Sequence, residues 1–123
     1  LQGQILGEEA NNINCKLIVE GANGPMDNLA ERLLMDRGID IIPDIYANGG
    51  GVIVSYFEWL QNNSGEYLSE ETIKKNLEEY MHNTFNKIID IKNAYQCSYR
   101  NAAYIISLKR LENTYMARGY IQD

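Results

Sequence analysis

The stretch KLIVEGANGPMDNLAERLLMDRGIDIIP, residues 16–43, determines the fold. Residues 16–20 are a short apolar run typical of a buried strand, and a turn rich in glycine and asparagine follows it. Apolar residues at helical spacing across residues 26–34 predict a helix, with Gly38 placed as its C-terminal cap. Residues 39–42 predict a second strand. A strand, a helix and a strand in such close succession predict a compact βαβ unit with parallel strands.

A glycine-rich stretch, NGGGVIVSYFEW at residues 48–59, follows this unit. Three consecutive glycines let the backbone turn sharply and approach a ligand closely, because no Cβ stands in the way. The β-branched residues after them favour a strand, whereas the wider apolar spacing favours a helix. We predict a helix that opens near Gly50 or Gly51, whose free N–H groups offer a place for an anionic group. Val52 and Ser55 then share one face of its first turns.

Two asparagine–glycine pairs follow the ends of the two predicted strands. Asn23 and Gly24 come after the first strand, and Asn48 and Gly49 come after the second, beyond a short connection at residues 44–47. In an open α/β sheet, ligands bind beyond the carboxyl ends of the strands, and neighbouring parallel strands lie about 5 Å apart. One ligand could therefore touch both pairs. Asn-Gly pairs are most often simple turns, so the residues alone leave a turn and a ligand contact both open.

The remaining sequence predicts helices. Residues 61–65 are expected to form a polar loop, and Ser69 is placed to cap the helix that follows. A helical stripe of apolar residues reaches about Ile91, and Asn93 is expected to break it.

The last helix is expected over residues 98–118, with residues 102–106 buried on several sides because they are apolar nearly all round. The predicted fold is therefore α/β, a single domain with a βαβ part at residues 1–50 and a helical part at residues 51–123.

Composition restricts the class of protein. The chain has 123 residues, 45% of them hydrophobic, and a net charge of −6, which argues against a nucleic-acid or anionic-membrane surface. Its apolar runs are far shorter than a membrane span. Cys15 and Cys97 lie far apart without metal-type spacing, which favours reduced thiols of a cytoplasmic protein over a disulfide. The chain begins at Leu1 rather than Met, so we expect a piece of a longer protein.

Candidate catalytic groups are few. No Ser/His/Asp set, phosphate-binding lysine loop or Gly-x-Gly-x-x-Gly motif is present, and His82 has no second histidine or cysteine near it for a metal. Asp44 could be a catalytic carboxylate, but one carboxylate after a strand is a weak signal. The residues by themselves therefore predict the ligand-binding half of an α/β fold.

Four motifs together resemble the glutamate dehydrogenase family. The spacing agrees nearly to the end of the chain, and the Ser-Tyr-Phe-Glu-Trp element favours glutamate over leucine and phenylalanine dehydrogenases. The motifs are EGANGP at residues 20–25, IPD at 42–44, NGGGVIVSYFEW at 48–59 and RNAAY at 100–104.

The resemblance implies the C-terminal part of a Rossmann-like nucleotide-binding domain, followed by C-terminal helices. Members of the family use NAD or NADP to oxidise L-glutamate reversibly to 2-oxoglutarate and ammonia, usually as homohexamers. The match implies that Asn23 contacts the cofactor, that Asn48 lies near nicotinamide and substrate, and that Gln4 is on the cofactor side. It implies that Ser55 binds a substrate carboxylate beside Val52.

The similarity covers only the C-terminal part of the family's sequence, without the catalytic lysine and aspartate. No catalytic residue is therefore expected in this segment, which needs the remainder of its own chain and is predicted inactive alone. Three positions depart from the family pattern: Gly49 replaces Ala, Asn101 replaces Thr, and Met26 replaces a Thr that caps the helix. Asp27 is expected to take over that cap.

Alternatives remain at this point. The chain could be a non-catalytic binding or oligomerisation module derived from the family, or a relative acting on another amino acid. NAD and NADP are not distinguished. A cytoplasmic location is expected, with an organelle left open.

Overall fold

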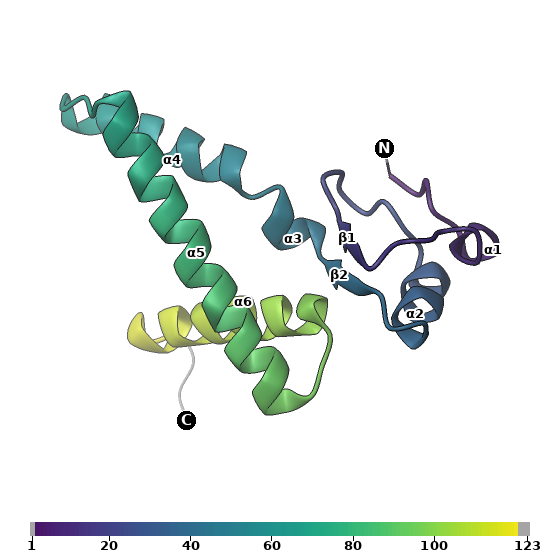
Figure 1. Ribbon diagram of the computed structural model, residues 1–123. Coiled ribbons are helices and arrows are strands. Elements are labelled where there is room, and N and C mark those ends of the chain that lie inside the picture. Colours follow the sequence, from purple (N-terminus) through teal and green to yellow (C-terminus); the bar gives the residue numbers. More distant parts are fainter. Residues whose placement is uncertain (1, 121–123) are drawn as a thin grey trace.

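The computed structural model describes residues 2–120. They form a mostly helical α/β arrangement in which a small βαβ part and a group of long helices lie at opposite ends (Figure 1). The elements are α1 (Gly7–Ala10), β1 (Leu17–Val19), α2 (Asn28–Asp36), β2 (Asp40–Ile42), α3 (Asp44–Ala47), α4 (Gly50–Ser64), α5 (Glu70–Tyr95) and α6 (Tyr99–Ala117).

The two strands are parallel, as predicted. Leu17 pairs with Asp40 and Val19 with Ile42, so the strands end side by side. Helix α2 packs against one face of this sheet and builds a core of Ala10, Ala30, Leu34, Ile39 and Ile41. The expectation that the first strand is buried was wrong for part of it. Leu17 and Val19 are 52% and 59% exposed, because their side chains point away from that core.

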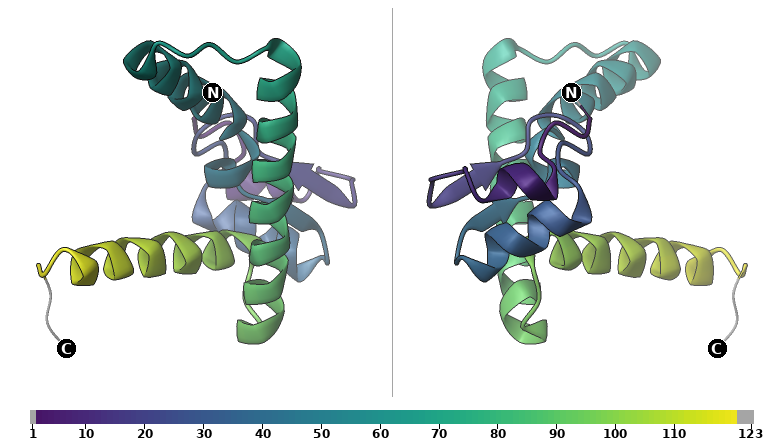
Figure 2. Two further views of the ribbon diagram at one scale, coloured as in Figure 1. Left: turned by 90° about the vertical axis from the view of Figure 1, so that its left-hand side faces the viewer. Right: turned by 90° about the vertical axis from the view of Figure 1, so that its right-hand side faces the viewer.

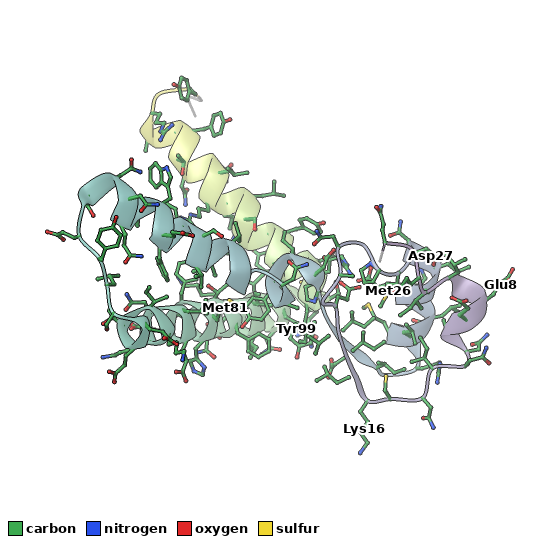
Figure 3. The ribbon with its side chains drawn as sticks, turned by 90° about the horizontal axis from the view of Figure 1, so that it is seen from above. Glu8, Lys16, Met26, Asp27, Met81 and Tyr99 are labelled. Atoms are coloured by element: carbon green, nitrogen blue, oxygen red, sulfur yellow. The ribbon has the colours of Figure 1, made fainter. Side chains whose placement is uncertain are left out.

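Helix α2 begins where the cap prediction placed it. Asp27 Oδ1 accepts a hydrogen bond from the Ala30 N–H over 2.6 Å, and Oδ2 accepts from the Gly7 N–H over 3.2 Å. Met26 stays outside the helix and forms an isolated bridge with Ile5. Figure 3 shows Met26 and Asp27 at the end of the molecule that carries α1 and Glu8. Asp27 therefore both starts α2 and ties it to α1.

The segment 44–47, expected as a connection, is a single helical turn, α3. Asp44 at its first position is favourable for the helix dipole, and the N–H groups of Tyr46 and Ala47 donate to the Pro43 carbonyl over 3.0 and 2.9 Å. Helix α4 then opens at Gly50, as predicted.

The prediction of a polar loop at residues 61–65 is wrong except for the last residue, Gly65. Helix α4 continues to Ser64, and Gly65 ends it with a left-handed φ of +73°, a conformation that glycine adopts without strain. The Gln61 side chain is buried, and its Oε1 accepts from the Leu68 N–H over 2.7 Å. Its amide therefore holds the chain where it leaves the helix.

The two later helices begin as predicted. Ser69 Oγ accepts from the Thr72 N–H over 3.2 Å, and Ser98 Oγ accepts from the Asn101 N–H over 3.1 Å. Asn93 does not break α5, which continues to Tyr95 and ends at Gln96 with φ +50°. A single asparagine lowers the stability of a helix by well under 1 kcal/mol, which the packing of the helix outweighs.

A second core joins the helices to the βαβ part. Ala102 and Ala103 of α6 are buried against Ile88 of α5, whereas Tyr104 is 47% exposed, so burial on several sides holds for the alanines only. Figure 2 shows that α6 crosses α5 near the C-terminal end of α5 and then runs away from that helix. Tyr46, Phe85 and Tyr99 stack in series, with ring centroids 5.4 and 6.2 Å apart.

The Tyr46 hydroxyl donates to the Met81 carbonyl over 3.1 Å. Figure 3 shows Tyr99 near the junction between the two parts of the molecule and Met81 farther into the helical part. This junction places α3, and with it the end of β2, against the long helices.

Cys15 and Cys97 are free thiols, as expected. Within residues 2–120, no helix is long and apolar enough to cross a membrane.

Candidate functional site

The two predicted asparagines meet at the carboxyl ends of the strands. Asn48 Nδ2 donates to Asn23 Oδ1 over 2.6 Å and to the Gly21 carbonyl over 3.3 Å. Asn23 belongs to the loop after β1, and Asn48 ends the helical turn after β2. The expected convergence of the two Asn-Gly elements on one sheet edge is therefore confirmed.

The loop after β1 has a conformation that depends on Gly24. Its φ is +53°, in the left-handed region that side chains with a Cβ rarely adopt. Its N–H donates to Asp44 Oδ2 over 2.7 Å, which links the loop to the first residue of α3. Gly24 thus turns the chain directly beside Asn23 and anchors it to the neighbouring strand end.

Asp44 is an acceptor with both oxygens engaged. Besides Gly24, the Ile45 N–H donates to Oδ1 over 2.7 Å, and Arg100 Nη1 donates to the same oxygen over 2.9 Å. Burial raises the pKa of the Asp44 carboxyl, but these hydrogen bonds outweigh it and hold that pKa below its ordinary value of 3.8. A carboxylate held this way is a poor proton acceptor, which speaks against the catalytic role considered from sequence.

Behind the asparagines lies an ion-pair cluster that the sequence did not reveal. Arg100 donates from Nη2 to Glu20 Oε2 over 2.6 Å and from Nε to Glu31 Oε1 and Oε2 over 2.8 and 3.0 Å, in addition to Asp44. Glu20 Oε2 also accepts from the Asp44 N–H over 2.8 Å. One guanidinium therefore holds carboxylates from the ends of both strands and from α2.

The cluster is largely shielded from water. The side chains of Glu20 and Arg100 are 0% and 19% exposed, and Glu20 Oε1 has no hydrogen-bond partner within the described residues. Burial lowers the pKa of the Arg100 guanidinium. Its hydrogen bonds to Glu31 and Glu20 raise that pKa by a larger amount, so the pKa lies above its ordinary value. Arg100 is therefore a permanent positive charge among three carboxylates.

Ser55 and Val52 lie on α4, beyond the glycine turn, and both are exposed, Val52 at 70%. Val52 lines a groove that Ser55 does not line; its described lining residues are Val52, Ile53, Tyr56, Phe57, Tyr80 and Arg110. These two predicted substrate residues are thus not joined to the asparagine pair by a direct contact in the part of the chain that the structure describes.

Gln4 lies in a segment that runs along the asparagine loop. On either side of it, the Gly3 N–H donates to the Gly24 carbonyl over 2.8 Å and the Ile5 N–H donates to the Pro25 carbonyl over 2.9 Å. The structure therefore brings this predicted cofactor-side residue close to Asn23 in the fold, although the two are far apart in sequence.

The site is suited to hydrogen bonding rather than to metal binding. Between residues 2 and 120, no group of three His, Cys, Asp or Glu side chains is arranged to hold a metal ion. The nearest carboxylates are occupied by Arg100. What the surface offers is two amides and a glycine turn, groups that recognise hydroxyls and carboxamides.

Comparison with known proteins gives a consistent picture. A family model described as Glutamate/Leucine/Phenylalanine/Valine dehydrogenase matches residues 1–119. The chain is 42% identical over 121 residues to the cryptic catabolic NAD-specific glutamate dehydrogenase of Bacillus subtilis, covering 98% of this chain and 28% of that protein. It is 42% identical over 120 residues to an NAD-specific glutamate dehydrogenase of Staphylococcus aureus (strain COL), covering 98% and 29%.

Solved structures agree with these sequence matches. A glutamate dehydrogenase from Peptoniphilus asaccharolyticus superposes with a TM-score of 0.93 at 36% identity, over 98% of this chain and 31% of that one. A hetero-hexameric glutamate dehydrogenase from Thermus thermophilus, in its Leu-bound form, gives 0.92 at 25% identity, over 99% and 29%. The chain thus spans less than a third of the length of these relatives.

Proposed function

Because this chain belongs to the Glutamate/Leucine/Phenylalanine/Valine dehydrogenase family, we propose that it is the C-terminal portion of the nucleotide-binding domain of a glutamate dehydrogenase. The enzyme oxidises L-glutamate to 2-oxoglutarate and ammonia, reversibly. The NAD-specific relatives favour NAD over NADP as its cofactor. In this proposal, residues 1–50 are the last βαβ part of a Rossmann-like domain and residues 51–123 are its helical part.

The observation that carries the proposal is the 2.6 Å contact between Asn48 and Asn23 at the carboxyl ends of two parallel strands. Dinucleotides bind at this edge of a doubly wound sheet. An amide pair offers donors and acceptors without charge, which suits the ribose hydroxyls and the nicotinamide carboxamide. The left-handed turn at Gly24 lets the backbone come close to such a ligand. The residues present therefore fit a dinucleotide.

Bound NAD supplies the hydride acceptor, and the residues of this chain bind and orient. Asn23 and Gln4 would hold the dinucleotide, and Asn48 would lie near the nicotinamide and the substrate. Ser55 would donate a hydrogen bond from its hydroxyl to a substrate carboxylate, and Val52 would be the apolar wall beside it. Hydride transfer requires the substrate carbon to face the nicotinamide with little angular freedom, so such fixed contacts contribute to the rate.

Proton transfer is assigned to the remainder of the enzyme. At the asparagine pair, the carboxylates that the described residues provide are bound by Arg100. We therefore expect the 123-residue chain by itself to show no glutamate turnover. Exposed apolar side chains on α6, such as Leu108 at 62% and Leu111 at 55%, support contacts with the rest of the chain and with other subunits of a cytoplasmic homohexamer.

The test is a titration of the full-length enzyme with NAD and NADP, followed by an assay of glutamate-dependent reduction of each. Asn23→Ala should weaken NAD binding by about 1–2 kcal/mol, the cost of a lost buried hydrogen bond. Asn12→Ala, at an exposed position after α1, is the matched control and should change nothing. Unchanged affinity in Asn23→Ala would contradict the proposal. Dinucleotide binding without turnover would point to a non-catalytic module.

A further inference from the structure

The loop that carries Asn23 is held by hydrogen bonds at both of its ends. Glu20 directly precedes the loop, and its backbone N–H donates to the Ile42 carbonyl over 3.1 Å. At the far end, the Gly24 N–H donates to Asp44 Oδ2 over 2.7 Å. The Asp44 N–H in turn donates to Glu20 Oε2 over 2.8 Å, so the Glu20 carboxylate is also joined to the backbone at the start of α3.

Arg100 donates hydrogen bonds to both the Glu20 and the Asp44 carboxylates. Nη2 contacts Glu20 over 2.6 Å and Nη1 contacts Asp44 over 2.9 Å, while Nε is held by Glu31 of α2. A guanidinium is planar and its N–H groups point in fixed directions, so it sets the angle between its partners as well as their separation. A lysine ammonium cannot reproduce this geometry.

Burial makes the arrangement stiff. The Glu20 side chain is 0% exposed, and the side chains of Arg100 and Asp44 are 19% and 16% exposed. Away from water, charged hydrogen bonds are stronger, and an unpaired partner is costly. Glu20 Oε1 finds no partner among the described residues, so the carboxylate makes its hydrogen bonds through its other oxygen alone.

We propose that Arg100 is a positioning residue for the dinucleotide site: it fixes Glu20 and Asp44 relative to each other, and thereby sets where Asn23 meets Asn48. Through Arg100, α6 becomes a structural support of a site that it does not line. The inference rests on the proposed function, since it takes the asparagine pair as the dinucleotide contact. Support of this kind matters because a site that is loose by about 1 Å loses function.

Arg37 provides a matched control. It also lies outside the site and also makes charged hydrogen bonds, donating from Nη1 to the Ala10 carbonyl over 2.6 Å and from Nη2 to the Ile13 carbonyl over 2.7 Å. Arg100→Lys and Arg37→Lys are therefore the same substitution at two structural arginines, of which only one is connected to the asparagine loop.

Three quantities are measured in the full-length enzyme: the melting temperature, the dissociation constant for NADH, and amide hydrogen exchange of a peptide spanning residues 21–25. Both variants are expected to melt earlier. Only Arg100→Lys is expected to raise the dissociation constant, by about fivefold or more, and to speed exchange in the loop by about tenfold. Arg37→Lys should leave both at the wild-type values.

The proposal is overturned if Arg100→Lys lowers the melting temperature while loop exchange or NADH affinity stays at the wild-type value. If that variant does not fold, Asp44→Asn replaces it, since it removes the charge that joins Arg100 to Gly24 with little change in shape. A higher dissociation constant for NADH and faster exchange in the loop are again expected. The absence of either change overturns the proposal. Failure of the wild-type enzyme to bind NADH refutes the proposed function instead, and loop exchange then decides alone whether Arg100 positions the loop.

Discussion

Arg100 Nη2 lies 2.6 Å from Glu20 Oε2, although 80 positions separate the two residues in the chain. The contact joins the start of the last helix to the residue that follows the first strand. Because Glu20 is almost completely buried, this ion pair stands in a setting where removing one partner leaves an uncompensated charge.

Arg100→Met should therefore lower the free energy of unfolding of the chain by about 3–5 kcal/mol. Urea denaturation followed by circular dichroism measures it. Lys74→Met is the control, because the Lys74–Glu70 pair is 2.7 Å long but 74% and 83% exposed, and solvent screens such pairs. Adding Glu20→Gln to Arg100→Met should recover part of the loss. Equal small effects of Arg100→Met and Lys74→Met would show that the buried cluster is not structural.

Ser55→Ala should lower kcat/KM for glutamate about tenfold or more in the full-length enzyme, from the loss of about 1.5–3 kcal/mol of a bond to a charged carboxylate. Dinucleotide affinity should stay nearly unchanged. Ser64→Ala, at the other end of α4, is the control: its Oγ accepts from the Glu66 N–H over 3.2 Å, so it affects stability rather than kinetics. Weaker cofactor binding with an unaltered KM for glutamate would place Ser55 on the wrong side of the site.

Asp27→Ala should destabilise the chain by about 1–2 kcal/mol, because Asp27 caps α2 and also accepts from the Gly7 N–H. Asp27→Asn keeps an acceptor oxygen for the Ala30 N–H and should lose less. Thermal unfolding of the three proteins gives the ranking. A variant series in which Asp27→Asn and Asp27→Ala are equally destabilised would mean that the charge, rather than the hydrogen bond, stabilises α2.

The lowered pKa of Asp44 predicts how stability depends on pH. The unfolded chain binds a proton at the ordinary value of 3.8, whereas the folded chain does so only at lower pH. The contribution of Asp44 is therefore fully present above 3.8 and is lost as the pH falls through the folded pKa. Denaturation midpoints measured downward from about pH 6 should fall less steeply in Asp44→Asn than in the wild type, because the variant has no carboxylate to protonate at this position. Parallel curves for the two proteins would contradict a lowered pKa of Asp44 in the folded chain.

The asparagine pair could be predicted from sequence, whereas the ion-pair cluster could not. Asn23 and Asn48 each follow a recognisable strand, and parallel strands bring their carboxyl ends to one edge, so local pattern plus topology was sufficient. Glu20, Glu31, Asp44 and Arg100 have no common spacing that would predict a contact between them. The available signal was that Glu20, Asp44 and Arg100 belong to three of the four motifs that carry the family resemblance.

The wrong helix boundaries have a similar cause. The polar residues 61–64 and Asn93 were expected outside helices, but they lie inside them. Gln61 does so because its side-chain amide bonds the Phe57 carbonyl over 3.3 Å and the Leu68 N–H over 2.7 Å, a pairing that depends on the later course of the chain. The left-handed residues Gly65 and Gln96, rather than the polar clusters, mark where these helices end.

Trp59 on α4 is the single tryptophan of the sequence, is 59% exposed, and stacks on Tyr56 with ring centroids 5.9 Å apart. Indole emission shifts to the blue when water is excluded, and it overlaps the absorption of reduced nicotinamide. The protein thus carries its own optical reporter on the helix that bears Ser55. A molecule or subunit that covers this face is expected to shift this emission to the blue, and under the proposed function bound NADH is expected to quench it by energy transfer.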